Sequence, residues 1–257
     1  MSDITGYICG ARGTRPVSGQ EFTEFGGDTT CYVIRRDRHA VVLDCGSGLS
    51  RAGVIFRDCD RIDVLMTHLH YDHILGLLDW GVFPSNICPT FYSTFPESWA
   101  RDFLTPPFWP VGPGKARMVQ ARNGESIDLG DGFRARFLPA NHPDGGCILR
   151  LETAGEALCF LCDFEHGKQL PEGFLDGCGL LVYDGTYTEE EYPAHVGWGH
   201  STWQEGCRLA GEAGIRRLII THHEPSCTDR QLREREEQAR RYFPAVRFAR
   251  DGDQFTL

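Results

Sequence analysis

One stretch constrains the fold of this chain more than any other: Thr67-His68-Leu69-His70-Tyr71-Asp72-His73. It directly follows an apolar run at residues 62–66, which predicts a buried strand. His68 and His70 are two residues apart, so on extended backbone their side chains project to the same side. Asp72 and His73 follow where the chain is expected to turn into a helical segment over residues 74–80. Two pairs of polar side chains are therefore presented from one corner at the end of a strand.

The side chains in this stretch are those that bind divalent metal ions. Imidazole nitrogen and carboxylate oxygen suit zinc, and also manganese or iron, because ligand type alone does not choose among these metals. A histidine-rich surface turn is the simpler explanation. However, three histidines and one aspartate within six residues exceed what one structural ion normally needs beside ligands from elsewhere. The stretch therefore predicts a metal site.

The charge and length of the chain narrow its class. At 257 residues it is within the range of one large α/β domain, and we expect residues 1–257 to form a single domain. The formal net charge of −10 gives no general attraction for phosphate backbones, so long nucleic acid is not an expected partner. We find no signal-peptide pattern at the N-terminus and no apolar run of about 18 residues. We therefore expect a soluble, cytoplasmic protein without membrane contact.

The 11 cysteines are an odd number and are scattered along the chain. Reduced thiols explain them best, because disulfide frameworks belong to short secreted chains. Cys159 and Cys162 form a C-x-x-C pair, but they lie in an apolar run that predicts a strand. We interpret both as core residues and not as a redox or zinc motif.

Strand-like and helix-like segments alternate along the chain, which favours two similar mixed α/β halves within one domain. The two strands at 31–35 and 40–44 are expected to pair antiparallel around a turn at residues 36–38. Expected strands cover residues 4–9, 31–35, 40–44, 62–66, 118–121, 132–138, 147–152, 157–161, 180–184 and 218–221, with a terminal strand near Val246. Expected helices cover residues 96–103, 202–213 and 228–242.

The region from about residue 84 to 115 is crowded with proline and aromatic residues and is interpreted as an insertion loop. Prolines at this density prevent long regular elements, so we expect only the short helix and an ordered irregular loop. The aromatic side chains, Phe108 and Trp109 among them, could pin the loop to the body, line a pocket or contact another subunit.

Further polar groups follow four of the later apolar runs, where a parallel or mixed sheet offers residues to a cleft beyond its strand ends. Each alone would be an ordinary loop residue. Together with the first stretch they supply the seven ligands of a two-metal site. They are Asn141-His142-Pro143, Cys162-Asp163-Phe164-Glu165, Tyr183-Asp184-Gly185 and Thr221-His222-His223.

These residues resemble the metallo-β-lactamase-fold hydrolases over most of the chain. Within that superfamily the chain looks like the phosphodiesterase branch that includes tRNase Z, the phosphonate-pathway cyclic phosphodiesterase and the anti-Pycsar cyclic-nucleotide phosphodiesterases. Besides the histidine stretch, the resemblance rests on Gly10-Ala11-Arg12-Gly13-Thr14-Arg15-Pro16, Gly26-Gly27-Asp28-Thr29, Tyr183-Asp184-Gly185-Thr186-Tyr187, Gly197-Trp198-Gly199-His200-Ser201-Thr202 and Thr221-His222. It implies a four-layer αββα sandwich with the metals at one edge between two sheets.

The resemblance also implies a ligand set. One ion would be held by His68, His70 and His142, and the other by Asp72, His73 and His222, with Asp163 bridging. His223 is left as a residue behind the ligands or facing the substrate. Two divalent ions are expected, with zinc first and manganese, iron or nickel also compatible.

The chemistry of the residues agrees with that resemblance. Two ions about 3.5–4 Å apart make hydroxide from a bridging water near neutral pH and offset the charge of a phosphodiester. The leaving alkoxide needs a proton, which a histidine held by a carboxylate can supply. We assign this role to His200, oriented by Asp184, against the alternative that His200 only caps a helix starting near Ser201. The expected catalytic residues are Asp72, His200 and Asp184.

The resemblance implies an enzyme that hydrolyses a small phosphodiester, and we expect a 3′,5′-cyclic nucleotide. The acidic charge supports a small substrate, and the segment between Asp163 and His200 is too short for the tRNA-gripping arm of tRNase Z. A homodimer is expected, because members of this branch commonly are dimers. Two alternatives stay open: thioester or lactone hydrolysis on the same fold, and a non-catalytic metal-binding accessory protein of a biosynthetic pathway.

Overall fold

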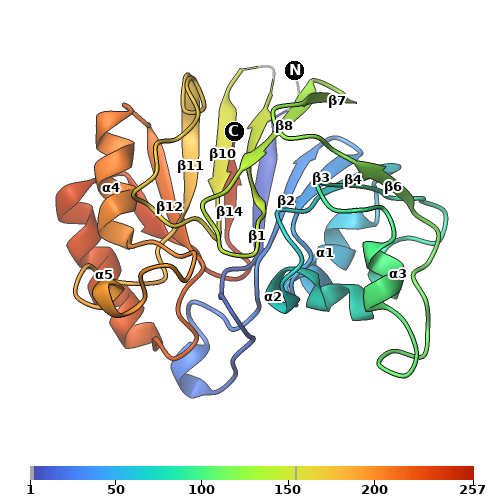
Figure 1. The fold of residues 1–257 in the computed structure, drawn as a ribbon, viewed down its shortest axis with the longest axis horizontal. Helices are drawn as coiled ribbons and strands as arrows, with labels where there is room; N and C mark the ends of the chain where they lie inside the picture. Colours follow the sequence, from blue (N-terminus) through green and yellow to red (C-terminus); the bar gives the residue numbers. More distant parts are fainter. Residues whose placement is uncertain (1–2, 154) are drawn as a thin grey trace.

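The computed structural model describes residues 3–153 and 155–257. Within these residues two seven-stranded sheets pack face to face, and helices cover the outer face of each (Figure 1). The layers are therefore helix, sheet, sheet and helix, which confirms the predicted αββα sandwich.

The first sheet combines an antiparallel half with a parallel half. β2 and β3 pair antiparallel, as predicted, and β4, β5 and β6 then follow in parallel. The strand order is β14 (Gln254–Thr256), β1 (Thr5–Gly10), β2 (Cys31–Arg36), β3 (His39–Leu43), β4 (Arg61–Leu65), β5 (Thr90–Ser93) and β6 (Arg117–Gln120).

The second sheet is also mixed, and its parallel strands come from the C-terminal half of the chain. Its strand order is β13 (Val246–Phe248), β12 (Arg217–Thr221), β11 (Cys178–Asp184), β10 (Ala157–Leu161), β9 (Cys147–Glu152), β8 (Phe133–Pro139) and β7 (Ser126–Gly130). The chain thus makes two mixed halves, but its last strand, β14, returns to the first sheet.

Successive side chains along each strand point to opposite faces of its sheet, and both faces of both sheets are buried. In β11, Val182 faces the core between the sheets, while Leu181 and Tyr183 face the helices. In β2, Tyr32 faces the other sheet and Val33 faces the outer helical layer. Strands covered on both faces need nearly continuous apolar sequence, which is what these runs have.

The helices divide between the two outer layers. α1 (Leu49–Phe56), α2 (Tyr71–Ile74) and α3 (Trp99–Phe103) lie on the first sheet, and α4 (Trp203–Glu212) and α5 (Asp229–Tyr242) lie on the second (Figure 1). The Thr202 side chain caps α4 by accepting from the Glu205 N–H. Thr228 and Gln231 form a capping box on α5. Among the described residues, no helix has the length and apolarity needed to cross a bilayer.

The prediction of a helix over residues 74–80 is wrong. α2 ends at Ile74 and is followed by 3₁₀ turns at Leu75–Leu78 and Trp80–Val82. Gly76 packs against the turn after β3 so closely that a Cβ there would lie 2.2 Å from the Gly46 carbonyl oxygen. This close approach leaves no room for a regular helix surface.

Three short strands, β5, β7 and β14, are missed by the sequence interpretation. β5 lies inside the proline-rich region, which also contains the expected helix as α3. Each of these strands has only three to five residues, so its apolar pattern is too short to recognise.

Candidate metal centre

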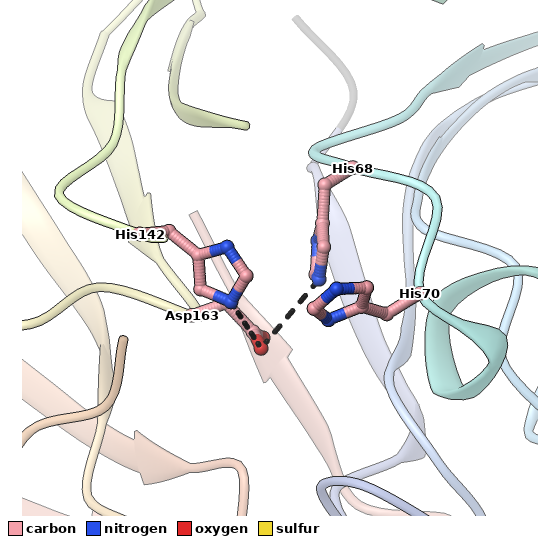
Figure 2. A group of neighbouring side chains, drawn as sticks. All are labelled: His68, His70, His142 and Asp163. Atoms are coloured by element: carbon pink, nitrogen blue, oxygen red, sulfur yellow. Dashed lines mark ion pairs between the residues drawn. The ribbon is translucent and has the colours of Figure 1, made fainter. Parts of the chain in front are cut away.

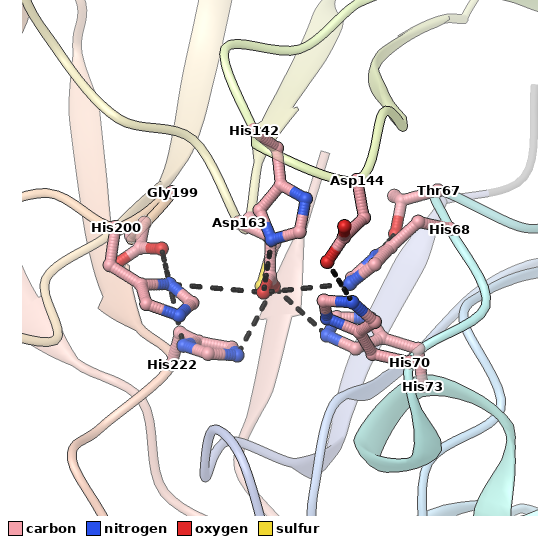
Figure 3. A network of polar contacts seen from close by, with 12 residues as sticks. Thr67, His68, His70, His73, His142, Asp144, Asp163, Gly199, His200 and His222 are labelled. Carbon is pink, nitrogen blue, oxygen red and sulfur yellow. Dashed lines mark hydrogen bonds and ion pairs between the residues drawn. The ribbon is translucent and has the colours of Figure 1, made fainter. Parts of the chain in front are cut away.

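The predicted site residues come from strand ends that meet at one edge of the sandwich. Six of them follow β4, β8, β10 or β12 directly or after a short turn: His68, His70, His73, His142, Asp163 and His222. Asp163 and His222 adopt positive φ angles of 53° and 57°, which turn their side chains sharply out of the strand direction. Such non-glycine conformations cost energy and are concentrated at functional sites. Figure 3 shows the imidazoles pointing inward toward Asp163 from both halves of the chain.

Asp163 is the centre of the cluster, and its two oxygens face different sides. Oδ1 lies 3.7 Å from His68 Nε2 and 3.9 Å from His142 Nε2 (Figure 2). Oδ2 lies 2.9 Å from His73 Nε2 and 3.1 Å from His222 Nε2. One carboxylate thus separates two groups of imidazoles.

The remaining two predicted ligands divide between these groups. His70 joins His68, His142 and Asp163 in a set whose ligand atoms lie within 4.8 Å of one another. Asp72 joins the other side, with Oδ2 3.2 Å from His222 Nε2 and 3.5 Å from His73 Nε2. The Asp72 carboxylate also accepts the Thr14 N–H at 2.6 Å. We name the set His68, His70 and His142 group one, and the set Asp72, His73 and His222 group two.

Neighbouring residues hold four of the imidazoles through Nδ1, which leaves Nε2 toward the centre. The pairs are His68 with Thr67 Oγ1 (3.1 Å), His73 with Asp44 Oδ2 (2.8 Å), His142 with the Gly145 carbonyl (3.1 Å) and His222 with Thr186 Oγ1 (3.0 Å). Metal-binding histidines usually have such a partner, because it fixes the ring orientation and tautomer.

The electrostatics of the centre favour a charged carboxylate among imidazoles. Burial raises the pKa of Asp163, but His222, His73 and His68 outweigh burial and hold that pKa well below its usual value. Burial lowers the pKa of His73, yet Asp163, Asp72 and Asp44 raise it well above normal. The charge state of each of these side chains therefore depends on the charges of its neighbours.

The donor set fits divalent cations. His68 Nε2, His73 Nε2 and Asp163 Oδ2 are buried and make no hydrogen bond of good geometry within the part of the chain that the structure describes, although His73 Nε2 and Asp163 Oδ2 lie 2.9 Å apart. Unpaired buried polar atoms are costly, and a shared cation would satisfy all three. All seven predicted ligands thus surround one point, and their binding of metal ions stays a prediction.

Cys162 lies closer to this centre than its interpretation as a core residue implies. Both Cys159 and Cys162 are buried in the apolar layers. However, the Cys162 sulfur also lies within 4.8 Å of the ligand atoms of His73, Asp163 and His222. It contacts Thr30 Oγ1 at 3.8 Å, and burial raises the pKa of its thiol well above the ordinary value.

His200 lies beside the centre and is held by Asp184. Its Nδ1 is 3.0 Å from Asp184 Oδ2, and its ring stacks on His222 with centroids 4.7 Å apart. Burial lowers the pKa of His200, but Asp184, Asp163 and Asp72 together outweigh burial and raise that pKa to about 9. Thr202 and not His200 caps α4, so the alternative of a capping histidine is not supported.

The centre opens into a cleft of about 790 Å³. His70, Asp72, Asp163 and His200 are among the residues that line it. Its other lining residues include Arg15, Tyr187, His195 and Trp198. A volume of this order is typical of sites for small molecules.

Two open questions about side chains near the cleft have clear answers. His223 is fully buried, donates from Nε2 to the Ala249 carbonyl at 2.9 Å and stacks on Phe248. Burial lowers the pKa of His223 to about 3. The idea that His223 faces the substrate is therefore wrong. Phe108 is 85% exposed, and neither it nor Trp109 is among the residues lining the cleft.

Sequence reasoning missed the roles of three residues around the centre. Asp44 follows β3 with φ 59° and accepts from Thr67 N and Oγ1, both at 2.7 Å, besides holding His73. The rule that polar residues at strand ends face the site would have found it. The same rule would not have identified Thr186. Glu165 follows a strand as predicted, but it binds the loop at 197–199 instead of the centre.

Comparison with known proteins agrees with this geometry. Residues 39–223 match the family described as "Beta-lactamase superfamily domain". The chain is 25% identical to ribonuclease Z of Gemmatimonas aurantiaca, over 87% of this chain and 88% of that protein. Its fold is similar to the metallo-β-lactamase fold protein YhfI from Bacillus subtilis (TM-score 0.75, 18% identity, all of both chains). A diphosphatase from the PhnP family is also similar (TM-score 0.70, 18% identity, 99% and 97% covered).

The chain belongs to the β-lactamase superfamily and has the metallo-β-lactamase fold, within its tRNase Z-like branch. It is therefore a metal-dependent hydrolase, as the sequence predicted, and its family implies divalent metal ions at this centre.

Proposed function

We propose that this protein hydrolyses a small phosphodiester, with a 3′,5′-cyclic nucleotide as the substrate. The observation that carries the proposal is the His200–Asp184 pair beside a carboxylate shared by two groups of ligands. Thioester hydrolysis does not need such a pair, because a thiolate departs without a proton more readily than an alkoxide does. Lactone opening also releases an alkoxide, and the comparison of substrates below separates it from phosphodiester hydrolysis. An accessory role without catalysis does not need the pair either.

Group one would hold one ion and group two the other, with Asp163 shared between them. When bound, two divalent ions supply Lewis acidity, which lowers the pKa of water and offsets charge on phosphoryl oxygens. The metals compatible with these ligands are zinc first, and manganese, iron or nickel.

The protein's own contribution is to hold a proton near the leaving group. Asp184 is fully buried and accepts the Nδ1–H of His200, so the imidazole cannot rotate freely. Thr186 donates from its backbone N–H and its hydroxyl to Asp184 Oδ1, which fixes the carboxylate in turn. The opposite nitrogen, Nε2, then carries the proton that the departing alkoxide needs.

The comparisons support phosphorus–oxygen chemistry more strongly than any particular substrate. Relatives named ribonuclease Z and a neighbour named diphosphatase point to phosphoester or phosphoanhydride bonds. The net charge of −10 and the size of the cleft favour a small molecule. Processing of RNA is the second candidate, because the ribonuclease Z relatives match along most of the chain.

The test is turnover by the purified, metal-loaded protein of 3′,5′-cyclic nucleotides, bis(p-nitrophenyl) phosphate and a 3′-extended tRNA. Hydrolysis of the two small substrates supports the proposal, and cleavage of the tRNA alone would favour the second candidate. Failure on every phosphodiester would overturn both.

His200→Ala is expected to keep both metal ions and to lose turnover of 3′,5′-cyclic nucleotides, whose leaving group is an alkoxide, about 10²- to 10⁴-fold, the range of general acid catalysis. His166→Ala is the control, because His166 lies outside the cleft lining and its Nδ1 contacts Ser201 Oγ at 2.8 Å. Loss of metal from the His200 variant would show that His200 is a ligand. Comparing ester and phosphodiester substrates on this variant separates the lactone or thioester alternative.

A further inference from the structure

Trp198 presents a large apolar surface to the cleft. Its side chain is 60% exposed, although it lies on a loop that lines the site. Beside it in the cleft wall, His195 packs edge-on with centroids 4.9 Å apart, and Tyr187 stacks on His195 at 4.1 Å with an interplanar angle of 16°. An indole that is supported by a neighbouring ring and is largely exposed is a surface on which a planar group can stack.

The loop that carries Trp198 is held in place from both sides. The N–H groups of Gly197 and Gly199, the two residues that flank the tryptophan, donate to the Glu165 carboxylate at 2.7 and 3.1 Å. The Tyr192 hydroxyl donates to the same carboxylate at 2.8 Å. Glu165 is buried, so these bonds are shielded from water. The exposure of Trp198 therefore reflects a fixed position, which reduces the entropy cost of binding a ring there.

The same loop links this surface to the reacting centre. His200 lies two residues after Trp198, so their Cα atoms are at most about 7 Å apart. Gly199, between them, packs against a predicted ligand so closely that a Cβ there would lie 2.3 Å from His142 Cδ2. Trp198 and His200 both line the cleft, so a ring on Trp198 and a phosphate at His200 would occupy the same site.

We infer that Trp198 is a specificity-determining residue that stacks on the base of a nucleoside phosphodiester. The inference rests on the proposed function and names its substrate class: phosphodiesters that carry a planar heteroaromatic base within one sugar of phosphorus. Trp198 acts by contact with the base, and Glu165 is a positioning residue that presents it.

A separate cation serves the phosphate, which allows ring and charge contributions to be distinguished. Arg15 lines the cleft, and in the described part of the chain its side chain has no hydrogen bond or ion pair. The nearby carboxylates are otherwise engaged: Glu191 pairs with Arg235 at 2.6 Å, and Glu224 accepts from the Ser226 N–H at 2.8 Å. Arg15→Ala should therefore weaken every phosphodiester, whether or not it has a base.

The experiment compares two esters with the same leaving group, thymidine 5′-(p-nitrophenyl phosphate) and methyl p-nitrophenyl phosphate. In metal-loaded Trp198→Ala, the ratio of kcat/KM for the thymidine ester over the methyl ester should fall about tenfold, within the range of base–aromatic stacking. The fall in this ratio should come from a higher KM for the thymidine ester. Trp198→Phe should restore most of the ratio, and Glu165→Gln should lower it, because its amide would face a loop N–H.

Val196→Ala is the matched control, since Val196 is 62% exposed on the same loop but does not line the cleft. It should leave the ratio unchanged, and Arg15→Ala should raise KM for both esters alike. A ratio unaltered by Trp198→Ala in a protein that hydrolyses both esters would overturn the inference.

A binding measurement keeps this inference separate from the proposed function. Calorimetry on the metal-loaded protein would compare adenosine 5′-monophosphate with ribose 5-phosphate. Tighter binding of the nucleotide by wild type, lost in Trp198→Ala, supports ring stacking even if neither ester is hydrolysed. Equal binding of the two by wild type would overturn it, whatever the turnover results.

Discussion

His70 and His73 lie three residues apart in one motif, yet their environments differ sharply. The His70 side chain is 44% exposed, and its Nε2 contacts Asp144, a residue that is itself 72% exposed. His73 is fully buried, and its Nδ1 is held at 2.8 Å by Asp44, which is also fully buried. Both are histidines that contact an aspartate, so residue type alone does not distinguish their environments.

The difference extends to the two groups around Asp163. In group two, the side chains of His73, His222 and Asp72 are 0%, 0% and 6% exposed. Group two also carries a carboxylate of its own, whereas group one has three neutral ligands and one of them reaches solvent. Buried partners interact strongly, because solvent does not screen them, and exposed ion pairs contribute little. We therefore expect group two to bind its ion more tightly and to depend more on its supporting residues.

Asp163→Ala removes what the two groups share and should have the largest effect. Both ions should be lost, and turnover should fall more than about 100-fold, beyond the range for residues that only orient a ligand. Elemental analysis of the purified variant measures the metal, and circular dichroism checks that it folds. Retention of two ions per chain would show that Asp163 is not the bridge.

A matched pair of substitutions tests the comparison directly. Asp44→Asn weakens the partner of a buried histidine and should lower metal affinity about 10- to 100-fold. Asp144→Asn makes the same chemical change to the partner of an exposed histidine and should alter affinity less than about threefold, as for exposed pairs. Metal titration by calorimetry measures both. Equal losses in the two variants would mean that burial of the partner does not set its contribution to metal affinity.

Removal of metal should proceed in order. Stepwise chelation is expected to release one ion per chain before the other, with midpoints separated by at least about tenfold in free metal, or about 1.4 kcal/mol. The first ion should come from group one, because His70 is solvent-exposed. His70→Ala identifies the site: it should eliminate the first step and leave the second. A single step that releases both ions together would mean that the groups do not differ as proposed.

Much of the site could be predicted, because its residues are local to strand ends. His68, His70, Asp72 and His73 share one short motif, and His142, Asp163 and His222 each follow an apolar run. Apolar runs that form central strands are readable from sequence, and the polar residue after such a run faces the edge where strand ends meet. The fold class followed from the same runs and from the resemblance they support.

Apart from the short strands, three of the misses, at Gly76, His223 and Cys162, have a common cause, which is contact between segments far apart in the sequence. Nothing local to residues 74–80 announces that Gly76 presses against the turn after β3. His223 follows His222 directly, but pairing of β12 with β13 sends it into the core beside Phe248. Cys162 fits a core pattern, and only the packing of two sheets brings its sulfur near the ligands.

From the sequence alone, the kinds of candidate ligand and their positions after the strands were predicted, because these depend on residue type and on local alternation, and the family resemblance implied how they divide between two ions. The tertiary structure decided which oxygen of Asp163 faces which group, that Glu165 holds the Trp198 loop, and which histidine is shielded from water. Those properties depend on distances between residues up to 150 positions apart, such as the Asp72–His222 contact. Such distances are set only when both sheets have packed.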